Sequence, residues 1–362
     1  MKKGKRTGSI DFWKFVCSIV IVLFHARNFT KIHTRPFING AIMVEFFFLV
    51  SGYLMVASLL KYEKRKQEGE AIPVGKTTFS YILHKVAGMC PEYYVAMIIG
   101  FLVTHVVGRD GKVVKDLLSS IWDVFFLSMG GFTGYHANGA TWYISAMLLA
   151  MLVLVPVCLK NRDLFLYVIA PMVGIFSMGV LYQNNGYLAG PERWQGFYMK
   201  GLLRALGELC LGAFSYVLVQ KLKEIRFTAF GKVCLAAIEL GGFGMVLAAS
   251  YFVPRGKTDF LLVVFLFVAV SVSFSHQSIL APIFDREIVY FLGKFSFSIF
   301  LGHIYWSHAI KKLFPHYGVT CQYLVYGVLT LITAMIIYGI SQILRKSAPA
   351  WKKWCRRLFV QE

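Results

Sequence analysis

Apolar stretches of roughly 20 residues recur from one end of this sequence to the other, and they constrain the fold more than any other feature. A helix of that length crosses about 30 Å of hydrocarbon, the thickness of a bilayer core. Only 15% of the 362 residues are charged, whereas soluble proteins carry about 25%, and the mean hydropathy is +0.61. The chain is therefore predicted to be an all-α polytopic protein in a lipid bilayer, without a separate soluble domain.

The apolar stretches predict a bundle of about ten transmembrane helices. They lie near residues 10–28, 41–60, 81–107, 140–159, 164–182, 200–219, 232–253, 258–276, 286–311 and 320–344. A weaker candidate at 117–133 contains Asp123 and several small polar residues, and we expect it to stay on the outer side as an interfacial or re-entrant segment. The transmembrane domain is predicted over residues 1–345, followed by a basic cytoplasmic tail at 346–362.

The basic residues decide the predicted orientation. The net charge is +20, and Lys and Arg cluster at the N-terminus, in 61–80, in 220–232 and after residue 344. Cytoplasmic segments of membrane proteins carry an excess of these residues. Ten crossings place all four clusters, and both termini, on the cytoplasmic side. Nucleic-acid binding is not expected, because a basic recognition face needs a soluble surface to display it.

The first apolar stretch, IDFWKFVCSIVIVLFHARNF (residues 10–29), contains three ionisable side chains that a bilayer disfavours. At about 100° per residue, Lys14 and His25 differ by about 20° and Asp11 and His25 by about 40°, so the three share one stripe. Lys14 lies toward the cytoplasm, and His25 lies about 16 Å farther along the axis. We expect the stripe to face the bundle interior, although interfacial residues that pair or snorkel are the simpler alternative.

Other predicted spans also carry polar side chains, as transporters and intramembrane enzymes do. Those in the outer half are Glu45, Trp142, Arg204 and His303, and those in the inner half are His84 and Lys85. Arg204 and Glu208 have the i,i+4 spacing of an ion pair on one helix. Polar residues in both halves fit a substrate path, or a reaction that draws on both compartments, and an imidazole near neutral pKa is suited to proton transfer.

Several motifs form an ordered set along the chain. After IDFWKFVCSIVIVLFH come VEFFFLVSGYLM, KVAGMCPEYYVAMI, ATWYISAMLLAM, GLLRALGELCLGAFSYVL and GKFSFSIFLGHIYW. This set resembles the acyltransferase-3 family of bacterial integral-membrane acyltransferases. The matching positions are Asp11, Lys14, His25, Phe47, Phe48, Ser51, Gly52, Lys85, Trp142, Arg204 and His303. The chain departs from the family where many members have Arg in place of Lys14, and a second Arg in place of Gly88.

The resemblance implies a membrane O-acyltransferase. In such a reaction an acyl group, commonly acetyl, moves from cytoplasmic acyl-CoA to a hydroxyl of an extracytoplasmic acceptor, and a cell-surface glycan is the expected acceptor. The implied catalytic residues are His25, as general base or acyl carrier, with His303 and Glu45 to orient it or stabilise charge. The implied donor-binding residues are Lys14, His84 and Lys85. The remaining motif residues with a structural part are Asp11, Ser51, Gly52, Trp142, Arg204 and Glu208.

Two other functions account for polar residues in the spans without this chemistry. One is a transporter that exports a glycan or a small metabolite, and the other is a sensor or resistance-associated membrane module. A transporter predicts substrate flux without CoA turnover. No permanently bound cofactor is expected, and no metal site either, because the seven cysteines occur singly and lack metal-ligand spacing.

Overall fold

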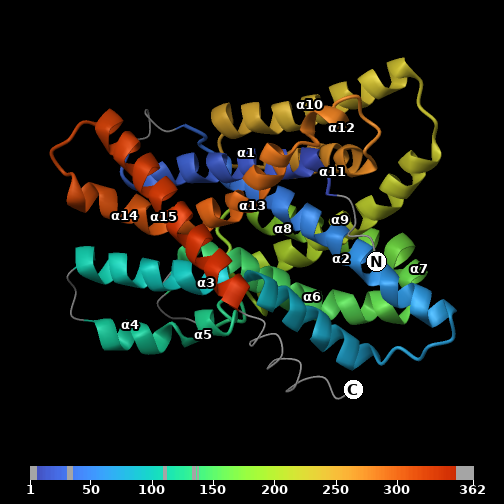
Figure 1. The fold of residues 1–362 in the computed structure, drawn as a ribbon, viewed down its shortest axis with the longest axis horizontal. Helices are drawn as coiled ribbons and strands as arrows, with labels where there is room; N and C mark the ends of the chain where they lie inside the picture. Colours follow the sequence, from blue (N-terminus) through green and yellow to red (C-terminus); the bar gives the residue numbers. More distant parts are fainter. Residues whose placement is uncertain (1–5, 31–35, 109–111, 133–135, 137, 348–362) are drawn as a thin grey trace.

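A computed structural model of the chain describes residues 6–30, 36–108, 112–132, 136 and 138–347. Within these ranges the protein is almost entirely helical, apart from an antiparallel hairpin of β1 Trp194–Gln195 and β2 Tyr198–Met199 (Figure 1). Nine described helices are long and apolar enough to cross a bilayer, and a bent helix pair is a tenth candidate if its two halves form one span. The predicted all-α membrane bundle is therefore confirmed. Of the predicted tail, the part after Ser347 lies outside the described residues.

The spans follow one another along the chain. They are α1 Gly8–His25, α2 Met43–Gln67, α3 Val74–Gly108, α6 Trp142–Lys160, α8 Ala170–Asn185, α9 Lys200–Glu224, α10 Ala229–Phe252, α11 Thr258–Ser275, the bent pair α13 Glu287–Gly302 and α14 Ile304–Leu313, and α15 Val319–Ser347. The 3-10 helices η1 Ala26–Asn28, η3 Gly40–Ile42 and η4 Gly139–Thr141 extend α1, α2 and α6. The span of α8 also includes α7 Arg162–Leu164 and the π-helical η5 Phe165–Ile169. The short helices α4 Val113–Ser119, α5 Ile121–Val124 and α12 Ala281–Phe284 lie between spans.

The weak apolar candidate at 117–133 does not form a span. Its helices α4 and α5 run back along the second half of α3 (Figure 1). Asp116 lies 3.3 Å from the His105 ring, and farther along, the Tyr93 hydroxyl donates to the Asp123 carbonyl at 2.7 Å. The segment therefore forms a hairpin with α3, which places Asp123 beside the middle of α3.

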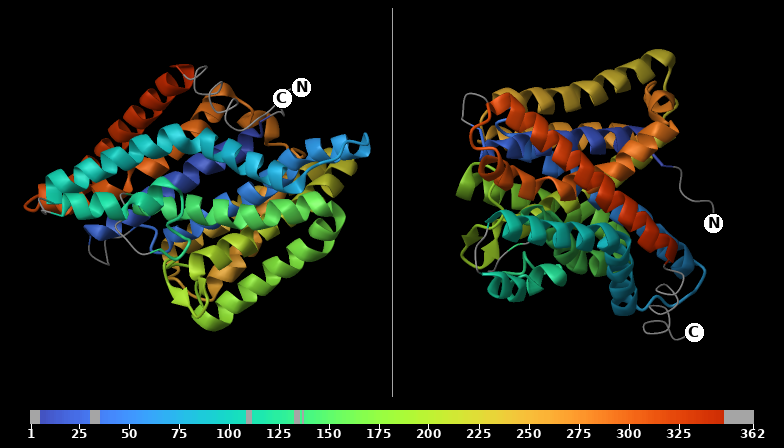
Figure 2. Two further views of the ribbon diagram at one scale, coloured as in Figure 1. Left: turned by 90° about the horizontal axis from the view of Figure 1, so that it is seen from below. Right: turned by 60° about the vertical axis from the view of Figure 1, so that its left-hand side comes forward.

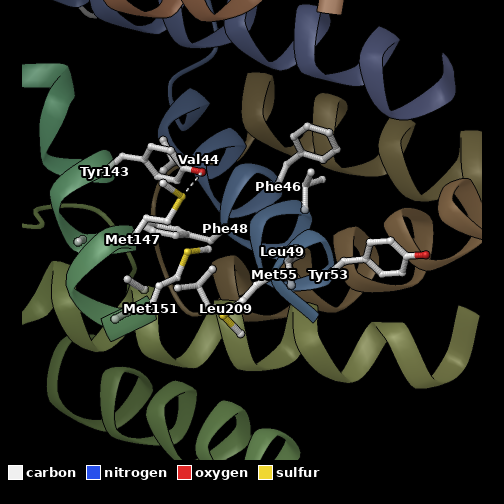
Figure 3. Close-up of a cluster of buried hydrophobic side chains, with 14 of the residues drawn as sticks. Val44, Phe46, Phe48, Leu49, Tyr53, Met55, Tyr143, Met147, Met151 and Leu209 are labelled. Carbon is white, nitrogen blue, oxygen red and sulfur yellow. Dashed lines mark hydrogen bonds between the residues drawn. The ribbon is translucent and has the colours of Figure 1, made fainter. Parts of the chain in front are cut away.

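The α2 helix packs between α6 and α9 in the centre of the bundle (Figure 3). Its buried side chains there are large and apolar, and they meet Tyr143, Met147 and Met151 of α6 and Leu209 of α9. This close packing holds the outer half of α2, which carries Glu45, against the start of α6.

Two glycines set the distance between α2 and α9. A Cβ atom on Gly52 would lie 2.1 Å from the Leu209 carbonyl oxygen, and one on Gly212 would lie 2.1 Å from the Leu49 carbonyl oxygen. Small residues allow such close backbone approach between membrane helices. The neighbouring Ser51 hydroxyl is 3.0 Å from the Tyr143 hydroxyl of α6. The Ser51–Gly52 motif thus fixes how three helices meet.

The outward faces of several spans are apolar. Phe176 of α8, Phe252 of α10 and Leu324 of α15 are among the exposed large hydrophobic residues. Figure 2 shows α8 at the lower edge of its left view and α10 at the upper edge of its right view. Because apolar side chains in these positions would meet lipid tails in a bilayer, the exposed surface fits a multi-pass membrane protein.

Candidate active site

The site begins at a break in a membrane-spanning helix. The sequence predicts one continuous helix over 286–311, but α13 ends at Gly302, α14 begins at Ile304, and their axes differ by 51°. His303 lies at the break and is fully buried. Irregular backbone at membrane depth is tolerated only where protein or a polar cavity surrounds it. The break is therefore a feature that positions His303 rather than a lipid-facing irregularity.

The two predicted catalytic histidines are in direct contact. His25 ends α1, and its Nδ1 lies 3.2 Å from Nε2 of His303. The same Nδ1 is 2.9 Å from the Ile21 carbonyl oxygen, and Nδ1 of His303 is 2.6 Å from the Phe300 carbonyl oxygen. Each ring is thus held by a carbonyl of the preceding helical turn, as well as by the other ring.

These contacts assign the hydrogens of both neutral rings. A carbonyl oxygen only accepts hydrogen bonds, so Nδ1 of each histidine carries a hydrogen. Nε2 of His303 then has a free lone pair, and it shares the single Nδ1 hydrogen of His25 with the Ile21 carbonyl oxygen. Nε2 of His25 is left without a hydrogen, and it is the nitrogen able to take a proton from another molecule.

The predicted polar stripe of α1 faces α13 at both ends, which are called inner and outer after the orientation predicted from the basic residues. At the inner end Asp11 is 3% exposed, and a Cβ atom on Gly293 of α13 would lie 2.4 Å from its Cβ. At the outer end His25 meets His303, which follows α13. Both ends of the stripe therefore pack against α13 or the residue that follows it, and the glycine in the late motif makes room for the aspartate in the first one.

The inner end of the stripe carries cationic side chains. Asp11 accepts hydrogen bonds from Nε of Arg6 at 2.7 Å and from Nζ of Lys14 at 3.4 Å. The Lys14 side chain is 25% exposed, and Lys85 of α3 is close enough for their charges to interact. His84 is exposed on the same helix. The structure thus brings Lys14 and Lys85 together. His84, the residue before Lys85, lies on the surface.

A further cation reaches this end from α15. Arg345 donates to the Gly88 carbonyl oxygen at 2.7 Å and pairs with Glu92 at 2.5 Å, both on α3. Gly88 is exposed, and nothing lies within 4 Å of where its Cβ would be. A guanidinium therefore lies one turn along α3 from Lys85. Sequence reasoning missed Arg345 because the contact joins residues 257 positions apart.

Glu45 belongs to a separate buried cluster. Its carboxylate pairs with the Arg204 guanidinium, which lies 5.0 Å from the Trp142 ring centroid and 3.9 Å from the Glu208 carboxylate. The predicted i,i+4 pair of Arg204 and Glu208 is present, but the pair with Glu45 is closer. Within the described residues, the hydrogen bonds and ion pairs of Glu45 do not include either histidine.

Comparison with known families decides the reaction class. The family model described as an acyltransferase domain, of the acyltransferase-3 type, matches residues 7–339, nearly the whole chain. The chain belongs to this acyltransferase-3 family. It is a membrane acyltransferase, and the matched range contains every site residue described above except Arg6 and Arg345. No curated protein and no solved structure matches the chain.

A second histidine contact in this acyltransferase-3 protein joins a histidine to an aspartate, on the predicted outer side. Nδ1 of His136 lies 3.0 Å from the Asp123 carboxylate, which is 1% exposed. The hydrogen bond that His136 donates to the Asp123 carboxylate raises the pKa of His136 above its usual 6.5, against the opposing effect of burial. The sequence identified Asp123 as a polar residue in a weak span, but no spacing rule connects it to a histidine in the following loop.

Proposed function

We propose that this membrane acyltransferase moves an acyl group, acetyl in the simplest case, from cytoplasmic acyl-CoA to a hydroxyl of an extracytoplasmic acceptor, a cell-surface glycan. The bundle then lies in the cytoplasmic membrane of a bacterium with both termini in the cytoplasm. The distribution of Lys and Arg supports this orientation, because the basic clusters all fall on the side where α1 begins and α15 ends.

The contact between His25 and His303 carries the proposal. As the acceptor oxygen bonds to the thioester carbonyl carbon, its proton passes to Nε2 of His25. The bond between that carbon and sulfur then breaks, and the departing thiolate of CoA takes the proton back from His25. His303 accepts the Nδ1 hydrogen of His25 throughout, which orients the ring and stabilises the imidazolium between the two transfers.

The inner cations suit the donor. CoA is anionic, and Lys14, Lys85 and Arg345 present positive charge at the end of the stripe nearer the cytoplasm. Charge-assisted hydrogen bonds to phosphate are stronger than neutral ones. Lys14 and His25 are about 16 Å apart along α1, which is comparable to the reach of an extended pantetheine arm. One donor molecule therefore spans both ends of the stripe.

His25→Ala in purified protein tests this function. Without the base, acyl transfer per folded molecule should fall by about 10²- to 10⁴-fold, because general acid–base catalysis contributes that much. CoA affinity and melting temperature should stay near the wild-type values, since His25 is remote from the inner cations. His316→Ala, at an exposed loop histidine, is the matched control and should transfer normally.

Two results would count against the proposal. Near-normal transfer per folded molecule by His25→Ala would end the catalytic role of His25. Loss of folded protein with normal transfer per folded molecule would show that His25 only packs the bundle.

A further inference from the structure

The break between α13 and α14 creates a helix end inside the bundle. The last four carbonyl oxygens of a helix have no partner within that helix, and an unpaired backbone group at membrane depth is costly. At the end of α13, Nδ1 of His303 contacts the Phe300 carbonyl oxygen at 2.6 Å. The Asn138 side chain donates to the next carbonyl oxygen, that of Leu301, at 2.7 Å. Asn138 is 1% exposed, so this hydrogen bond is buried.

The Asn138 amide serves the helix break and its own turn at the same time. Its Oδ1 accepts from the Ala140 N–H at 3.0 Å, which caps the start of η4. Because this contact fixes the oxygen on one side, the NH₂ group faces the Leu301 carbonyl, where only a donor can bond. Aspartate has the same shape as asparagine but lacks the donor. The two contacts together therefore require an amide at this position.

The other half of the break is tied to the end of α1. The Asn28 side chain in η1 donates to the Ser307 hydroxyl at 2.7 Å, and that hydroxyl donates to the Ile304 carbonyl oxygen at 2.6 Å. The η4 turn also lies against this half, since a Cβ atom on Gly139 would be 4.0 Å from Cγ1 of Ile304. The start of α14 is thus held beside the end of α1, and the η4 turn contacts both halves of the break.

We infer that Asn138 is a positioning residue for the histidine pair, and this inference rests on the proposed function. Its hydrogen bond to Leu301 holds the end of α13 against η4, and so fixes His303, two residues later, at 3.2 Å from His25. Without the amide donor, the Leu301 carbonyl gains a partner if the backbone straightens into a continuous helix, where each carbonyl accepts from the N–H four residues on. That change moves the His303 ring away from His25.

The test compares two variants that keep the cap of η4 and lose the donor to Leu301. Asn138→Ser retains an N-cap oxygen on a shorter side chain, and Asn138→Asp retains both the shape and the N-cap oxygen. Asn161→Ser is the matched control. Asn161 also caps a helix, by accepting from the Leu164 N–H at 3.0 Å, and it lies at the start of α7 on the predicted cytoplasmic side.

Nitrogen-15 NMR of histidine-labelled enzyme in lipid measures the placement of His303 without any acceptor. In the wild-type protein, Nε2 of His303 accepts a hydrogen bond from His25, which moves its signal away from that of a free unprotonated nitrogen. Both Asn138 variants should lose this displacement, and Asn161→Ser should keep it. If Asn138 serves stability alone, its variants should melt at lower temperature with the His303 signal unchanged.

Enzyme kinetics supply a second readout. The donor is acetyl-CoA, and the acceptor is a surface-glycan extract, deacetylated with mild base, from cells that lack the gene. Both Asn138 variants should lower kcat per folded molecule by about 10²-fold, the loss that a misplacement of about 1 Å produces. The KM for acetyl-CoA should stay at the wild-type value, because the inner cations lie at the other end of the stripe.

The two readouts separate this inference from the function on which it rests. An unchanged His303 signal in both Asn138 variants would overturn the inference, whatever their kcat. A changed signal with a normal kcat would overturn the catalytic role of the histidine pair and would support the placement of His303 by Asn138. No transfer to the extract by wild-type enzyme would overturn the proposed glycan acceptor, and the His303 signal would still decide the inference.

Discussion

The two ends of the polar stripe on α1 hold their side chains in different ways. At the inner end, the Lys14 and Arg345 side chains are 25% and 39% exposed, and their partners are carboxylates that a bound anion is able to replace. At the outer end, His25 and His303 bond to each other and to backbone carbonyls, which leaves one defined nitrogen for chemistry. One end is suited to receiving a large charged ligand, and the other to placing one proton.

The largest expected effect comes from the buried charges of the outer half. Arg204→Ala leaves Glu45 and Glu208 buried without their cation, and breaking a buried pair in this way costs about 3–5 kcal/mol. The melting temperature and the yield of folded protein in detergent should both fall clearly. Arg65→Ala removes the partner of Glu70 on an exposed surface and should leave the melting temperature unchanged. Equal melting temperatures for the two variants would show that the buried Arg204 cluster contributes no more stability than an exposed ion pair.

An intermediate effect is expected on donor binding at the inner end. Lys14→Ala and Lys85→Ala should each weaken CoA binding about tenfold, since each removes a charge-assisted contact. Added salt should reduce the difference in CoA affinity between each variant and the wild-type protein. Isothermal titration calorimetry with CoA measures this directly. Lys221→Ala, at a lysine whose side chain is 66% exposed, serves as the control and should bind CoA normally. Unchanged affinity in both test variants would remove these lysines from the donor site.

The smallest expected effect is a pH dependence on the outer side. Because Asp123 raises the pKa of His136 in the folded protein, the pair adds stability that is full below the ordinary pKa of 6.5 and is lost as pH rises through the raised value. His136→Gln should therefore lower the melting temperature by about 2 °C at about pH 5.5, and by less at about pH 8. If His136→Gln lowers the melting temperature more at the higher pH, the pair stabilises the protein more at high pH than at low pH, which would contradict this expectation.

The sequence was sufficient to predict the spans because a bilayer leaves few alternatives for a long apolar stretch. It was also sufficient for the stripe, since helical periodicity alone puts Asp11, Lys14 and His25 on one face. The break at His303 was missed because GKFSFSIFLGHIYW reads as one continuous apolar helix without proline. The contact of Arg345 with Gly88 could not be predicted, because it depends on how distant helices pack and leaves no local pattern.

The most direct measurement of the central claim is the protonation of each histidine ring nitrogen. Nitrogen-15 NMR of histidine-labelled enzyme in lipid, with His25→Gln and His303→Gln used to assign the signals, distinguishes protonated from unprotonated nitrogens. At neutral pH we predict that His25 and His303 both carry their hydrogen on Nδ1, with Nε2 of His25 free to accept a proton. A hydrogen on Nε2 of His25 would contradict this account, because the ring could not then act as the base for the acceptor hydroxyl.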